Sequence, residues 1–99
     1  MKRIVVRYKV RPEVAAQNEQ LIKQVFAELE RKSPPGVRYV ALKLSDGTFM
    51  HFSMTEDGAA PIPGLEAFRI FQSEIKERCV EPPLQAEATI VGNYQMLRE

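Results

Sequence analysis

The spacing of apolar and polar residues changes several times along the chain and divides it into predicted elements. Residues 4 to 10 alternate with the two-residue period of a β-strand. One side of this strand carries Ile4, Val6, Tyr8 and Val10, and the other carries Val5, Arg7 and Lys9. From Glu13 to Lys32 the period becomes 3.6 residues, which predicts an amphipathic helix. Its apolar stripe consists of Val14, Leu21, Val25, Phe26 and Leu29, with Ile22 at the edge.

Residues 37 to 55 predict two strands joined at Ser45-Asp46-Gly47. A two-residue loop would align Val40, Leu42 and Leu44 with Phe49, His51 and Ser53. A three-residue loop with Gly47 left-handed would align them instead with Met50, Phe52 and Met54. Because a shift of one residue exchanges the faces, we favour the three-residue loop, which concentrates the apolar residues on one face. We expect that apolar face to meet the helices. The other face would then carry Tyr39, Ala41, Lys43, Phe49, His51 and Ser53.

A second helix is predicted from Leu65 to about Arg78, because Leu65, Phe68, Phe71, Ile75 and Cys79 form an inner stripe. Pro82 and Pro83 are expected to fix a turn after it. A last strand is then predicted from Ala86 to Tyr94. The order β-α-β-β-α-β is typical of a ferredoxin-like α+β sandwich, in which two helices cover one face of a four-stranded antiparallel sheet. We therefore expect one domain over residues 1–99.

Composition and charge exclude several classes of protein. Fourteen basic and thirteen acidic residues leave a net charge of +1, so a nucleic-acid partner is not expected, although Lys2, Arg3, Arg7, Lys9 and Arg11 lie close together. The single cysteine, Cys79, cannot form an internal disulfide and is expected to pack in the core. No run of residues has the pattern of a signal peptide or a membrane span. We therefore expect a cytoplasmic protein without a membrane partner.

The face of the sheet that the helices leave uncovered predicts self-association. In the favoured register this open face carries Val5, Tyr39, Ala41 and Phe49 among its polar residues. A contiguous apolar patch of this kind usually marks an interaction surface, and the simplest partner is a second copy of the chain. We expect a homodimer formed through this face.

Four segments carry a resemblance to a known group of proteins. These are Arg38-Tyr39-Val40-Ala41-Leu42-Lys43-Leu44-Ser45-Asp46-Gly47, Phe49-Met50-His51-Phe52, Ala67-Phe68-Arg69-Ile70-Phe71-Gln72 and Arg78-Cys79-Val80-Glu81-Pro82-Pro83. With the order of elements, they resemble the dimeric α/β-barrel superfamily, which includes the antibiotic-biosynthesis-monooxygenase-like domains. The resemblance implies two sheets packed face to face into an eight-stranded barrel, often around a ligand-sized pocket. It implies no single reaction, because the superfamily includes oxygenases, isomerases and proteins without known activity.

The catalytic sets of that superfamily do not carry over to this chain. Its quinone-forming monooxygenases use Asn, Trp and Tyr, and its haem-degrading members use Asn, Trp and a helical His. This chain has no Trp, its one His lies on a predicted strand, and Asn18 and Asn93 lie outside matching motifs. We expect no metal and no cofactor.

The candidate ligand-binding residues are Arg7, Tyr39 and His51, which share the open face in the favoured register. His51 is the candidate catalytic residue, because an imidazole titrates near neutral pH and can give or take a proton. Together the three could bind a small aromatic or anionic ligand. His51 could equally form a hydrogen bond across the dimer interface. Two functions stay open: a small-molecule enzyme such as a cofactor-independent oxygenase or an isomerase, and a non-catalytic ligand-binding or structural homodimer.

Overall fold

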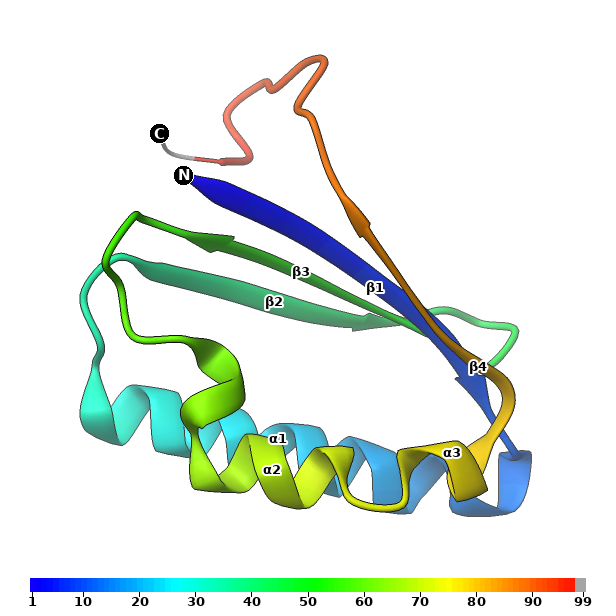
Figure 1. Ribbon diagram of the computed structural model, residues 1–99. Helices are drawn as coiled ribbons and strands as arrows, with labels where there is room; N and C mark the ends of the chain where they lie inside the picture. The colour runs from blue at the N-terminus through cyan, green and yellow to red at the C-terminus, as the bar shows by residue number, and fades with distance from the viewer. Residues whose placement is uncertain (98–99) are drawn as a thin grey trace.

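The predicted order of elements and the ferredoxin-like α+β class are confirmed in the computed structural model, which describes residues 1–97 (Figure 1). The last two residues of the predicted 1–99 domain lie outside this range. The strands are β1 (Lys2–Val10), β2 (Val37–Lys43), β3 (Thr48–Thr55) and β4 (Cys79–Glu87). The α-helices are α1 (Ala15–Lys32), α2 (Glu66–Gln72) and α3 (Ile75–Arg78), and the single-turn helices are η1 (Pro12–Val14) and η2 (Ile62–Gly64).

The four strands form one antiparallel sheet in the order β2-β3-β1-β4, and all three α-helices lie against the same face of it (Figure 1). The core lies between these two layers. Its buried side chains are Tyr8, Val10, Ile22, Val25, Phe49, Ile62, Leu65, Phe71 and Ile75. Ile22 and Val25 come from α1, so the predicted stripe of that helix does reach the core. Among residues 1–97, no helix is long and apolar enough to cross a membrane.

The two helical segments are joined by a carboxylate. Glu28 of α1 is buried, and its Oε1 accepts a hydrogen bond from the backbone N–H of Ala67 in the first turn of α2, at 2.7 Å. Its Oε2 lies 2.6 Å from Nζ of Lys32. The Lys32 bond and then the Ala67 N–H lower the pKa of Glu28 to about 2. A negative charge is favourable at this position, because the first N–H groups of a helix lack partners within it.

The predicted hairpin register is confirmed. Val40 faces Phe52 and Leu42 faces Met50, as the three-residue loop requires. The N–H of Leu44 donates to the carbonyl of Thr48 at 2.8 Å, and Gly47 has a φ of 89°. The Asp46 carboxylate accepts a further hydrogen bond from the Thr48 N–H, at 2.9 Å, and so closes the loop.

The predicted orientation of the hairpin was wrong. Phe49 and His51 are buried on the side of the sheet that meets the helices, and the row that includes Val40 and Leu42 lies on the open face. Pairing with β1 explains this orientation, because Tyr8 pairs with Phe49 and Val6 with His51. Residues paired across neighbouring strands share a face. Both faces of the hairpin are rich in apolar side chains, so apolar content did not identify the buried one.

The second helical region and the last strand also differ from the prediction. The helix breaks after Gln72, at Glu74 with its φ of 62°, and resumes as α3. The last strand is Cys79–Glu87 rather than Ala86 to Tyr94, so Pro82 and Pro83 lie within β4 instead of in a turn. β4 is an edge strand, where a residue without an N–H can be accommodated, and its pairing with β1 shifts register after Arg7.

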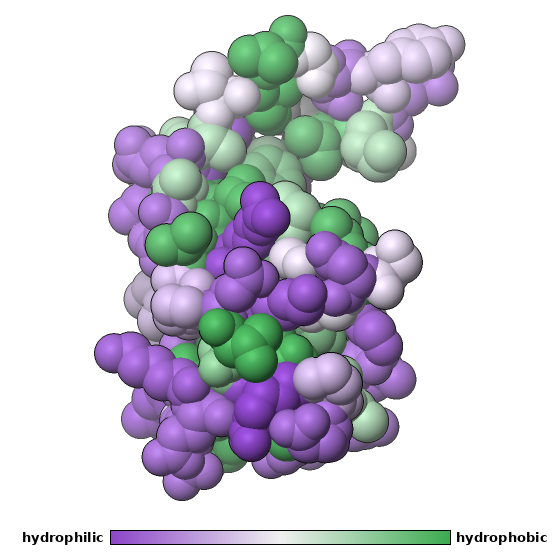
Figure 2. All heavy atoms as spheres, turned by 90° about the vertical axis from the view of Figure 1, so that its right-hand side faces the viewer, coloured by the Kyte–Doolittle hydropathy of each residue, from purple (hydrophilic) through white to green (hydrophobic). Residues whose placement is uncertain are grey.

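The segment after β4 lies over one end of the open face. The N–H of Ala88 donates to the carbonyl of Arg3 at 2.9 Å, and Met96 and Leu97 line a groove together with Phe52 and Met54. This cover explains why Met54, on the open face, is only 2% exposed. In Figure 2 the segment forms the top of the molecule, where apolar (green) and polar (purple) atoms lie next to one another.

Replacing Gly47 by alanine tests the hairpin loop. Apart from the two neighbouring residues, the only atom of residues 1–97 within 4 Å of the added Cβ is Cε of Lys9, at 3.7 Å, so the cost comes from the positive φ rather than from a clash. We expect Gly47→Ala to lower the free energy of unfolding in urea by about 1 kcal/mol. The matched control is Gly92→Ala, because Gly92 lacks a positive φ and has open space around it, so a change within about 0.5 kcal/mol is expected. Equal effects of the two substitutions would contradict this account of the loop.

Candidate functional site

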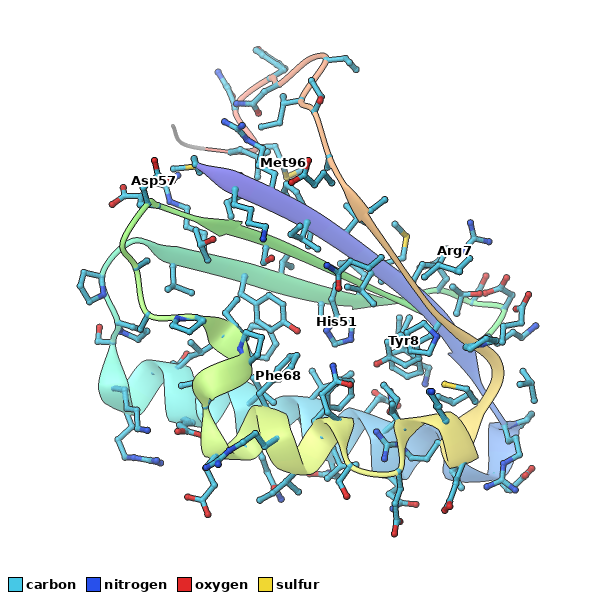
Figure 3. The ribbon with its side chains drawn as sticks, in the orientation of Figure 1. Arg7, Tyr8, His51, Asp57, Phe68 and Met96 are labelled. Carbon is cyan, nitrogen blue, oxygen red and sulfur yellow. The ribbon has the colours of Figure 1, made fainter. Side chains whose placement is uncertain are left out.

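His51 lies near the middle of β3 and points from the sheet toward the helices (Figure 3). Its side chain is 5% exposed, and its ring lies among those of Tyr8, Tyr39 and Phe71, with centroid distances of 5.4 to 5.7 Å. The prediction that it lies on the open face was therefore wrong. His51 lies within the layer between the sheet and the helices, not at an interface between two sheets.

Two tyrosines bind the two ring nitrogens of His51. The Tyr8 hydroxyl from β1 lies 2.8 Å from Nε2, and the Tyr39 hydroxyl from β2 lies 2.5 Å from Nδ1. Both strands are neighbours of β3 in the sheet, so hydroxyls reach the imidazole from both sides. The Tyr39 ring is held in turn by stacking on Phe26 of α1, at a centroid distance of 5.0 Å.

The hydrogen-bonded chain continues into the helices through two residues that were not predicted to belong to the site. Asn18 of α1 is 0% exposed, and its Nδ2 donates to the Tyr8 hydroxyl at 3.0 Å. Arg78 at the end of α3 is 5% exposed, and its Nε donates to Oδ1 of Asn18 at 3.2 Å. Asn18 lies four and seven residues before the buried Ile22 and Val25. A polar residue at a stripe position is the signal that could have identified it.

A cavity of about 280 Å³ lies beside this chain, between the sheet and α2. Tyr8, Tyr39, His51 and the buried Phe71 line its inner end, and the exposed Lys2, Pro61, Pro63, Gln72 and Gln85 line its outer end. Phe68, which lies below His51 in Figure 3, and Ile62 add further apolar wall. The volume is close to the lower limit for small-molecule sites. Lys2 is the charged side chain of this lining, and no carboxylate belongs to it.

Burial keeps the groups of the site neutral. It lowers the pKa of His51 to about 4, so the imidazole is uncharged near neutral pH. Burial raises the pKa of both Tyr8 and Tyr39 well above the usual value of 10, although the Asn18 hydrogen bond partly opposes this for Tyr8. The site therefore presents neutral hydroxyl and imidazole groups to the cavity rather than charges.

The structure brings together two of the three predicted ligand-binding residues. Tyr39 and His51 touch and both line the cavity, but Arg7 lies on the open face, where it pairs with Met50 and Leu84. In Figure 3 the Arg7 side chain points away from the helices. Grouping Arg7 with Tyr39 and His51 was therefore wrong. Arg7 is adjacent to Tyr8, which faces the helices, and adjacent residues of a strand point to opposite faces. Cys79 is half-buried against the core, as its predicted packing role requires.

Comparison with known proteins shows that this chain is similar to solved structures rather than to curated sequences. No family model matches the sequence, and no curated protein matches it significantly. An antibiotic biosynthesis monooxygenase superposes with a TM-score of 0.75 at 15% identity, covering 93% of this chain and 100% of that one. A candidate antibiotic biosynthesis monooxygenase from Bacteroides thetaiotaomicron superposes with a TM-score of 0.78 at 15% identity, covering 98% and 95%. The chain has the antibiotic biosynthesis monooxygenase fold.

One further structure with this fold is a variant of SnoaB, described as a cofactor-independent oxygenase from Streptomyces nogalater. It superposes with a TM-score of 0.66 at 15% identity, covering 95% of this chain and 96% of that one. The resemblance found in the sequence is thereby confirmed for the fold, and such distant identity carries no reaction with it. In residues 1–97 no group of three or more His, Cys, Asp or Glu side chains could hold a metal ion.

The neutral state of His51 predicts how stability depends on pH. Its folded pKa of about 4 lies below the unfolded value of 6.5, so the unfolded chain binds more protons between these values. Stability is then lost as the pH falls below 6.5. We expect the free energy of unfolding to drop by about 1 kcal/mol from pH 7 to pH 5.5, measured in urea. The decrease should be absent in His51→Gln. An equal decrease in that variant would show that another group causes it.

Proposed function

We propose that this chain binds a small aromatic molecule in the cavity between its sheet and α2, and that Tyr39, itself bonded to His51, forms a hydrogen bond with an oxygen atom of that molecule. The observation that carries the proposal is the Tyr8–His51–Tyr39 chain in the wall of an otherwise largely apolar cavity. An apolar pocket with a few convergent polar groups and perturbed pKa values is the usual form of a small-molecule site. The apolar walls suit a ring, and the hydroxyls suit a carbonyl or phenolic oxygen.

The reaction that we propose is a cofactor-independent oxygenation. SnoaB supports this proposal, because it is a cofactor-independent oxygenase with the same fold. In such a reaction a phenol or an enolisable ketone loses a proton to water at the outer end of the cavity, since no carboxylate of residues 1–97 lines it. The electron-rich anion then supplies the electrons to O₂, one oxygen atom of which enters the product while the other leaves as water. A hydrogen bond from Tyr39 would stabilise the negative charge that then develops on the substrate oxygen. His51 would support Tyr39 from behind as a neutral partner, because its low pKa makes it a weak base.

Removing the Tyr39 hydroxyl tests the site. We expect Tyr39→Phe to weaken binding of 1-indanone and 4-indanol by about three- to tenfold in calorimetric titrations, the loss of one neutral hydrogen bond. The control is Tyr94→Phe, which removes the same hydroxyl from a side chain that is 86% exposed and does not line the cavity. Equal losses in both variants, or a parent protein that binds neither compound, would contradict the proposed binding site.

Oxygen uptake separates the enzyme from its non-catalytic alternative. With 1-naphthol as substrate, whose conversion to 1,4-naphthoquinone takes one oxygen atom from O₂ and releases the other as water, we expect the parent protein to raise oxygen uptake above the spontaneous rate, and Tyr39→Phe to lower that increment. Binding of the probes without any increment would favour a ligand-binding protein over an oxygenase.

We also propose that the chain forms a homodimer through the open face of its sheet. This face carries the adjacent apolar side chains Val5, Val40, Leu42, Met50, Phe52, Leu84 and Ala86. Leu42 is 54% exposed and Leu84 is 72% exposed in the single chain. A contiguous apolar surface of this kind is typically covered by a partner, and a two-fold axis would place each patch on its own copy.

Light scattering of charged variants tests this dimer. Leu84→Arg should shift the mass from that of a dimer, about 22–23 kDa, toward that of the 11.3 kDa chain, because an unpaired charge would be buried at the interface. Ile70→Arg on α2 is the matched control, since Ile70 is also exposed, at 49%, but belongs to the helical layer. A parent protein that is a monomer at micromolar concentration would overturn the proposed dimer.

A further inference from the structure

The hydrogen bonds at the buried end of the hydrogen-bonded chain have a fixed donor-to-acceptor direction, because the guanidinium of Arg78 can only donate. Its Nη1 donates to the carbonyl of Ser73 at 3.0 Å, and its Nη2 to the carbonyl of Phe71 at 2.6 Å. Its Nε donates to Asn18, which must therefore present Oδ1 to the guanidinium. The amide nitrogen of Asn18 then faces the Tyr8 hydroxyl and donates to it.

This orientation determines what Tyr8 and His51 do. The Tyr8 oxygen accepts from Asn18, so its own O–H needs an acceptor, and Nε2 of His51 lies 2.8 Å away. The side chain of Tyr8 is 2% exposed, so a hydroxyl proton without an acceptor would be costly there. A neutral imidazole that accepts at Nε2 carries its proton on Nδ1. That N–H donates to the Tyr39 oxygen.

The last hydroxyl of the chain is then left for a ligand. The Tyr39 oxygen accepts from His51, so the Tyr39 O–H is available to the cavity that this side chain lines. We propose that Arg78 and Asn18 are positioning residues that set the direction of every hydrogen bond from Arg78 to Tyr39. Tyr39 then donates a hydrogen bond into the cavity and selects ligands with a carbonyl or similar acceptor oxygen. The ligand part of this inference rests on the proposed function, whereas the direction of the chain does not.

The tautomer of His51 in the parent protein tests the direction without any ligand. Correlation of the imidazole nitrogens with the ring protons by ¹⁵N NMR at pH 7 distinguishes a protonated from an unprotonated ring nitrogen. We expect protonation at Nδ1 and a free lone pair at Nε2. Protonation at Nε2 would overturn the proposal, because Tyr39 would then donate to His51 and not to the cavity.

Asn18→Asp should reverse the direction of the hydrogen bonds among Tyr8, His51 and Tyr39 with almost no change in the shape of the side chain. An aspartate accepts from Arg78 and also from the Tyr8 hydroxyl, so the Tyr8 oxygen becomes the acceptor for Nε2–H, and Tyr39 must donate to Nδ1. We expect the His51 proton to move to Nε2. Binding of 1-indanone, which can only accept hydrogen bonds, should weaken by about three- to tenfold relative to 4-indanol, which can also donate one. Loss of packing alone would produce neither the moved proton nor the change in the ratio of the two affinities.

Asn93→Asp is the matched control, since it makes the same substitution at an exposed turn where Asn93 Oδ1 accepts from the N–H groups of Met96 and Leu97. It should leave both the tautomer and the ratio of the two affinities unchanged. A folded Asn18→Asp protein that keeps the parent tautomer would overturn the positioning role. If this variant does not fold in a thermal melt, the tautomer of the parent protein decides the question. A parent protein with Nδ1–H that binds neither probe would refute the proposed function and leave the direction of the chain supported.

Discussion

A buried neutral histidine requires a hydrogen-bond partner for each ring nitrogen, and the sheet supplies both. Ala41 and Val6 lie directly opposite His51 on the two neighbouring strands. Tyr39 lies two residues before Ala41 on β2, and Tyr8 lies two residues after Val6 on β1. Diagonal neighbours in a sheet are within reach of long side chains, and the smaller residues directly opposite leave room for the two rings. The site therefore depends on the register of the hairpin, which the three-residue loop at Gly47 helps to set.

The sequence was sufficient to predict the order of elements, the long first helix and the hairpin register, because each depends on local periodicity and turn chemistry. It was insufficient to predict which face of the hairpin is buried. The row with Val40 and Phe52 is more apolar than the row with Tyr39 and His51, yet the second row meets the helices. Pairing with β1 determines which face of the hairpin is buried, and contacts between strands that are distant in sequence do not affect local periodicity. Asn18 was missed for a related reason, since counting it as polar concealed its place in the buried stripe.

The reversed orientation of the hairpin strengthens the expectation of self-association and changes the expected location of the ligand site. The open face is more apolar than predicted, and Leu42, Met50 and Phe52 on this face favour the proposed self-association. The proposed ligand site lies in the layer between one sheet and its helices, and not in a barrel between two sheets. Because the two features lie on opposite faces, a ligand in the cavity and a second copy on the open face do not compete for the same surface.

The positive charge at the inner end of the chain explains which ligands the cavity should favour. The guanidinium of Arg78 is held by two carbonyl oxygens and the Asn18 amide, and it lies over the Phe71 ring at 5.5 Å. Its charge therefore polarises the chain of hydrogen bonds in one direction, and such polarisation is stronger in a buried environment. Each donor in the series is made a better donor by the one behind it. The hydroxyl of Tyr39 stands at the far end, so the arrangement favours an oxygen that is partly or fully negative and disfavours a cation.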